Sequence, residues 1–101
     1  LNIEEGDKTI LPDQVELESY PNPFNPQMQI KFYLPGPGQI NLSLFDIKGR
    51  SIHTLAEGHF VQGAHSFEWN PAQNQHISSG VYLVMLQTGN SILSKKILYL
   101  K

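Results

Sequence analysis

Histidines and carboxylates are the residues that could carry catalysis, and neither group is arranged for it. The four histidines lie in four different segments, so no spacing brings two of them to one face beside a carboxylate. We expect surface or strand-edge positions for all of them, that is for His53, His59, His65 and His76. Of the nine carboxylates, four fall within the first fourteen residues, namely Glu4, Glu5, Asp7 and Asp13. The remaining five offer no evident general acid and base pair.

Nucleophiles and phosphate-binding loops are also missing from the pattern. No serine stands in a Gly-x-Ser-x-Gly elbow, and the glycines are isolated rather than gathered into a phosphate-cradling loop. We therefore expect a protein that is not an enzyme and that holds no metal or cofactor.

Composition excludes further classes. A formal net charge of −2 leaves no basic stripe, so nucleic acid is not an expected partner. Cysteine is absent, which removes disulfides and thiolate metal sites. No apolar run approaches the roughly 20 residues that a membrane-spanning helix needs. A length of 101 residues suits one domain.

The first fourteen residues differ from the rest of the chain. They contain scattered charges, Gly6 and Pro12 without any apolar period, which is typical of a linker. We place the domain boundary near Val15, so that 1–14 is a tether and 15–101 is the folded domain. The start at Leu1, without a charged and apolar leader, suggests an excised piece of a longer protein.

From Val15 onward the apolar residues follow a period of two, which indicates strands. No window shows a sustained helical stripe. Asp46 and Gly49 stand at the first and fourth positions of a type I turn, and Gly89-Asn90 is a two-residue hairpin signal. We predict seven strands, at 15–20, 27–34, 40–44, 50–56, 66–69, 81–86 and 92–101. Their number and spacing predict an all-β, immunoglobulin-like antiparallel sandwich.

Two apolar features locate the core. Residues 81–86 are apolar on both faces, as expected of a central strand covered on each side. Trp69 shares a face with Phe67 and is the only tryptophan, so we expect it to be buried.

The least generic stretch runs from Tyr20 to Pro26, with the sequence Tyr-Pro-Asn-Pro-Phe-Asn-Pro. Three prolines in six residues fix φ and stiffen the chain before it folds. This pattern predicts a rigid corner between the first two strands, with Phe24 plugging the end of the core.

These motifs together carry a family resemblance. The proline-rich stretch is followed by an alternating strand ending in Leu34-Pro35, then by Leu-Phe-Asp-Ile-Lys-Gly-Arg at 44–50 and by Ser-Gly-Val-Tyr at 79–82. In this order and spacing, over 17–101, the chain resembles the C-terminal sorting domain of type IX (Por) secretion cargo. The basic residues near the end fit the same pattern.

The resemblance implies a seven-stranded immunoglobulin-like sandwich that acts as an export signal. It implies a covalently preceding cargo domain, recognition by an outer-membrane translocon and sortase-like machinery, and cleavage or attachment to surface lipopolysaccharide. The location would be the periplasm in transit, then the medium or the cell surface. The residues that match the family motifs are Pro21, Asn22, Pro23, Phe24, Asn25, Pro26, Asp46, Gly49, Arg50, Gly80, Val81, Tyr82, Lys95, Lys96 and Lys101.

Two interpretations of these motif residues are open: they contact the translocon, or they make the fold. For the turn residues Asp46 and Gly49, the strand entry Gly80, and the packing pair Val81 and Tyr82, fold chemistry already accounts for the residue types.

Lys95 and Lys96 are adjacent, so in a strand they point to opposite faces. They are either charges that discourage edge pairing or part of a recognised terminal handle. Two other functions are a structural spacer and a carbohydrate-binding module. The latter would use rings among Tyr20, Tyr33, Phe45, Tyr82 and Tyr99.

Overall fold

The computed structural model describes residues 14–21, 27–70 and 77–100, and every regular element in these ranges is a strand. Within them, no helix is long and apolar enough to cross a membrane. The strands are β1 Glu16–Tyr20, β2 Met28–Leu34, β3 Gly38–Asp46, β4 Ser51–Phe60, β5 Gly63–Trp69, β6 Gly80–Gln87 and β7 Ile92–Tyr99. The predicted all-β fold with seven strands is confirmed.

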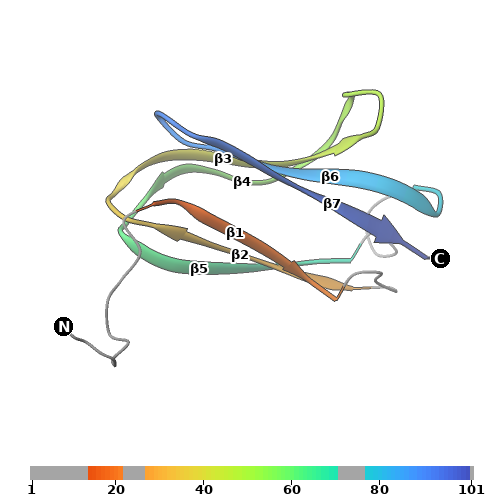
Figure 1. The fold of residues 1–101 in the computed structure, drawn as a ribbon, viewed down its shortest axis with the longest axis horizontal. Helices are drawn as coiled ribbons and strands as arrows, with labels where there is room; N and C mark the ends of the chain where they lie inside the picture. The colour runs from red at the N-terminus through yellow and green to blue at the C-terminus, as the bar shows by residue number, and fades with distance from the viewer. Residues whose placement is uncertain (1–13, 22–26, 71–76, 101) are drawn as a thin grey trace.

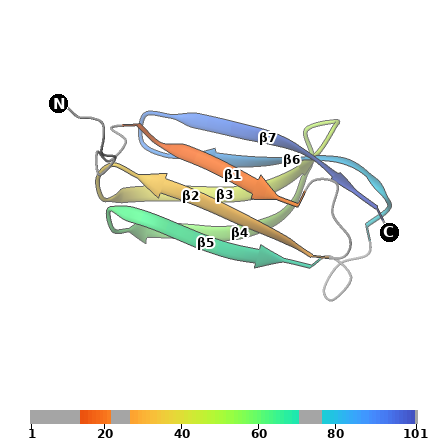
Figure 2. The same cartoon turned by 60° about the horizontal axis from the view of Figure 1, so that its bottom comes forward.

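The strands form two antiparallel sheets that face each other (Figure 1). One sheet has the order β1-β2-β5 and the other the order β4-β3-β6-β7. Figure 2 turns the three-stranded sheet toward the viewer. This two-layer arrangement is the immunoglobulin-like sandwich that the strand pattern predicts.

The core lies between the sheets and is built from alternate residues of each strand. In β2 the even positions Met28, Ile30, Phe32 and Leu34 are all buried, as their period of two predicts. Leu42 and Leu44 face them from β3, and both are fully buried. Trp69 is 4% exposed, so its predicted place in the core is also confirmed.

Strand bounds differ from the prediction mainly in β4. The pattern predicts an end at Ala56, but β4 continues through Gly58 to Phe60. Gly58 pairs with Ile40 of β3, so the ladder continues across a residue that is usually unfavourable in a strand. Pairing with β3 therefore overrides the local glycine signal.

The prediction that β6 is covered on both faces is wrong. Tyr82, Val84 and Leu86 are buried between the sheets, but Val81 on the opposite face is 37% exposed. The strand is central within its sheet, between β3 and β7, yet no described element lies over its outer face (Figure 1). An apolar run thus indicated a central position without indicating a second layer.

Several predictions fall outside the described residues. Residues 1–13 of the predicted tether 1–14, the corner residues 22–26 with Phe24, His76 and Lys101 lie there. Pro21 is described and exposed, directly after the end of β1.

Candidate recognition surface

The three described histidines occupy two different settings. His53 and His59 are exposed on β4. The ring of His65 is half-buried and lies 5.1 Å from the rings of both Phe32 and Phe60. Its Nε2 is 2.8 Å from the carbonyl oxygen of Val61. No group of three metal-binding side chains occurs in the described parts of the chain.

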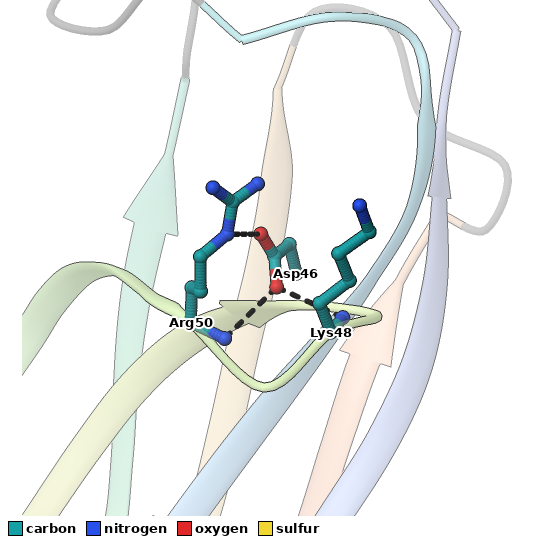
Figure 3. Close-up of polar contacts among 3 residues, drawn as sticks. All are labelled: Asp46, Lys48 and Arg50. Carbon is teal, nitrogen blue, oxygen red and sulfur yellow. Dashed lines mark hydrogen bonds and ion pairs between the residues drawn. The ribbon is translucent and has the colours of Figure 1, made fainter.

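The turn between β3 and β4 is organised around the Asp46 carboxylate (Figure 3). Its Oδ1 accepts hydrogen bonds from the backbone N–H groups of Lys48 and Arg50, both at 2.9 Å. Its Oδ2 accepts one from Arg50 Nε at 2.7 Å. The backbone N–H of Gly49 donates to the Asp46 carbonyl at 3.0 Å, which closes the predicted turn.

Gly49 completes this turn with a φ of +87°, a conformation that L side chains rarely adopt. A type I turn followed by a left-handed glycine is a favoured way to reverse an antiparallel pair, because its twist matches that of the strands. Asp46 and Gly49 therefore have a clear role in making the fold.

Hydrogen bonds also shift the protonation of this carboxyl. The backbone N–H of Arg50, followed by the Arg50 side chain and the Lys48 N–H, holds the pKa of Asp46 below its usual range against an opposing effect of burial. The carboxyl is thus held in its charged form by the turn that it organises.

The side chain of Arg50 is more exposed than that of Asp46 and uses fewer of its hydrogen-bonding groups within the turn. Its side chain is 76% exposed, whereas that of Asp46 is 13% exposed. Only Nε contacts Asp46, and the two terminal nitrogens of the guanidinium point away from the carboxylate (Figure 3). The turn therefore fixes the stem of the arginine and leaves the donor pair facing solvent. Ile47, at the tip of the same turn, is 69% exposed.

The second motif, at the start of β6, divides between the two faces of the sheet. The Tyr82 hydroxyl donates to the Ser78 carbonyl oxygen at 2.6 Å, and the ring is 8% exposed. This is a tyrosine corner of the kind that immunoglobulin-like folds use. Burial, and then the charge of Asp46, raise the pKa of Tyr82. Val81, which was expected to pack like Tyr82, points outward instead.

Strand β7 carries the lysine pair and lies at the edge of its sheet. Lys95 pairs with buried Val84 and Lys96 pairs with Leu83, so the two side chains project from opposite faces as predicted. Both are exposed, while Ile97 and Tyr99 in the same strand are 1% and 2% exposed. The strand therefore combines core residues with a charged edge.

The structure brings some motif residues together and keeps others apart. Asp46 pairs with Tyr82, so the turn and the start of β6 lie at one end of the sandwich. Lys95 and Lys96 pair further along β6, nearer its middle. Sequence reasoning missed Ile47, although its place between Asp46 and Gly49 at the tip of a turn was a signal for exposure.

The exposed motif residues of this small sandwich lie on a turn and on an edge strand. Comparison with known proteins defines the class further: residues 18–100 match the family of secretion system C-terminal sorting domains. The chain belongs to this family. Its members act in general as sorting signals for type IX secretion rather than as catalysts, and the sorting role implies export across the outer membrane.

Among solved structures, the chain is similar to PorZ, which is described as an essential bacterial surface component of the type IX secretion system of Porphyromonas gingivalis. The TM-score is 0.54 at 20% sequence identity, and the match covers 84% of this chain and 11% of PorZ. At this identity the likeness concerns the fold. The search of curated protein sequences gave no match.

Proposed function

We propose that this domain directs a covalently preceding cargo protein through the outer-membrane translocon of a type IX system. The observation that carries the proposal is the family match over 18–100, which spans the sandwich from β1 to β7. Cargo would pass through the periplasm and be released or attached to surface lipopolysaccharide. Sortase-like machinery would cut within 1–14, because the compact sandwich begins after it.

Two exposed groups are the proposed contacts with the translocon. One is the guanidinium of Arg50 at the β3–β4 turn, and the other is the lysine pair on β7. Both groups are exposed cations that are not part of the hydrophobic core. Charges at an exposed edge or turn contribute little to stability but can make binding to a partner specific. Asp46, Gly49 and Tyr82 serve the recognition by holding the fold.

The test must separate recognition from folding. Deleting 94–101 would remove Ile97 and Tyr99, which are buried, and would damage the core along with the handle. Point variants are therefore preferable. We expect Lys95→Glu to reduce export of a reporter fused ahead of residue 1 while leaving the melting temperature of the domain unchanged. Arg50→Glu should also reduce export, but with a lower melting temperature, because it removes the ion pair to Asp46; its export is therefore measured at a temperature where the variant is folded. The double variant should reduce export further.

Lys31→Glu is the matched control, because Lys31 is exposed on the other sheet and the change in charge is identical. Export that is equally impaired by the three single variants, Lys95→Glu, Arg50→Glu and Lys31→Glu, would refute a localised contact. Failure of the unaltered domain to export the reporter in a type IX-competent host would refute the proposed function itself.

A further inference from the structure

The outer face of the three-stranded sheet displays two tyrosine rings. Of the aromatic residues considered for a sugar platform, Tyr82 and Tyr99 are buried, and Phe45 is half-buried on the other sheet. Tyr20 and Tyr33 remain: Tyr20 is 43% exposed, and Tyr33 alternates with buried Phe32 and Leu34. Both rings therefore lie on the face that Figure 2 turns toward the viewer.

The strand register places polar residues between the two rings. Tyr33 pairs with Glu16, Lys31 with Glu18, and Gln29 with Tyr20. The rings are thus two rows apart, or roughly 13 Å at the rise of an antiparallel strand. The Tyr20 hydroxyl donates to Gln29 Oε1 at 2.9 Å, which fixes the orientation of that ring.

A hollow of about 170 Å³ lies beside Tyr33, lined by Glu16, Glu18, Lys31 and Ala64. Its floor is low because the β5 residues in these rows, Ala64 and Ser66, are small. Drug-sized ligands need pockets of roughly 300–1,000 Å³, so this hollow suits a single ring of a longer ligand.

The polar groups around the hollow retain their bonding capacity. Within the described residues, the side chains of Glu16 and Glu18 have no ion-pair or hydrogen-bond partner. The Lys31 ammonium lies 5.9 Å from the centre of the Tyr20 ring rather than against Glu18. Carboxylate acceptors, ammonium donors and an aromatic wall are therefore available together.

This set of groups selects among ligand classes. Paired carboxylate oxygens bind hydroxyl groups, and a tyrosine ring covers the apolar face of a ring-shaped ligand while its hydroxyl hydrogen-bonds. Two carboxylates against one ammonium repel anions. We propose that this face binds a neutral oligosaccharide, with one sugar ring in the hollow against Tyr33 and the chain running along β1 and β2 toward Tyr20. This binding function is separate from the proposed sorting function and does not depend on it.

The test is a titration of the full 101-residue chain with cellohexaose, mannohexaose and maltohexaose, followed by amide NMR shifts. We expect at least one of these sugars, at millimolar concentration, to shift residues of the hollow and not those of the other sheet. Tyr33→Ala should weaken binding about tenfold, because a lost contact with an aromatic ring can cost about 1.4 kcal/mol, which corresponds to a tenfold change in affinity.

Ala64→Leu is a second test that does not depend on the stability of Tyr33→Ala. Position 64 is exposed, so the larger side chain fills the hollow without disturbing the core. It should abolish binding. Glu57→Gln on β4 is the control for Glu18→Gln, since both glutamates are exposed and only Glu18 lines the hollow. The proposal is overturned if no sugar of the panel shifts these residues, or if Ala64→Leu binds as tightly as the unaltered chain.

Discussion

The β3–β4 turn and strand β7 both carry family motif residues, but they use their charges differently. In the turn, the Asp46 carboxylate accepts three hydrogen bonds from within the same five residues. In β7, Lys95 and Lys96 are exposed beside buried Ile97. The family motifs thus contain both residues that stabilise the fold and residues whose side chains are exposed to solvent. Measuring stability and export independently separates the two kinds.

The largest expected effect tests the core side of β7. Ile97→Ala should lower the free energy of unfolding by about 2–5 kcal/mol, because Ile97 is 1% exposed and its removal leaves a cavity. Chemical denaturation measures this change. Lys95→Ala in the same strand should change stability by less than about 0.5 kcal/mol. An equal loss of stability in Ile97→Ala and Lys95→Ala would show that the lysine contributes to the fold as much as the buried isoleucine does.

The next effect tests the turn. Gly49→Ala should cost about 1–2 kcal/mol, because an alanine is strained at a φ of +87°. Gly89→Ala is a suitable control, since Gly89 does not have a positive φ and a Cβ there would meet no atom within 4 Å. If Gly49→Ala leaves the melting temperature unchanged, the turn must adopt another conformation that accepts an alanine.

Tyr82→Phe should cost about 0.5–1.5 kcal/mol, the value of one hydrogen bond, because only the contact to the Ser78 carbonyl is lost. Export should remain intact at a temperature where the variant is folded. An export defect without a loss of stability would move Tyr82 from the fold-making group to the recognition group.

A small effect at neutral pH is expected for Asp46→Asn, since the amide oxygen can still accept the two backbone hydrogen bonds and the contact that is lost is the ion pair to the exposed Arg50 side chain. The pKa of Asp46 is lower in the folded protein than in the unfolded chain, so its charge stabilises the fold above the unfolded pKa of about 3.9. That contribution is lost as the pH falls through the folded pKa. As the pH is lowered, the melting temperature should therefore fall less steeply for Asp46→Asn than for the unaltered chain. Glu57→Gln should show the same steep fall as the unaltered chain, because it keeps Asp46.

Much of the fold follows from the sequence because alternation and turn chemistry are local signals. The four buried positions of β2, the Asp46–Gly49 turn and the burial of Trp69 were all predicted on that basis. Sheet membership was not. Only Val61 and Gln62 separate β4 from β5, yet these strands belong to different sheets. Which strands pair depends on the whole core, and no local pattern records it.

The residues of the proposed recognition surface could be named from the sequence, but their positions in the fold could not. Arg50 and the lysine pair could be named from motifs, whereas the orientation of the guanidinium depends on the three-dimensional turn. The hollow beside Tyr33 could not be found, because it arises where Ala64 of β5 adjoins Tyr33 across a ladder between distant segments. The open outer face of β6 is a similar case, since an apolar run does not say how many layers cover it.

Strands β1 and β7 lie side by side and run in the same direction, each hydrogen-bonded within its own sheet (Figures 1 and 2). The chain therefore enters the sandwich at one end of its long axis and leaves at the other. Tension applied between these two points would act along the strands and perpendicular to the hydrogen bonds of β1 with β2 and of β7 with β6, so that each ladder would have to shear as a whole instead of opening one bond at a time.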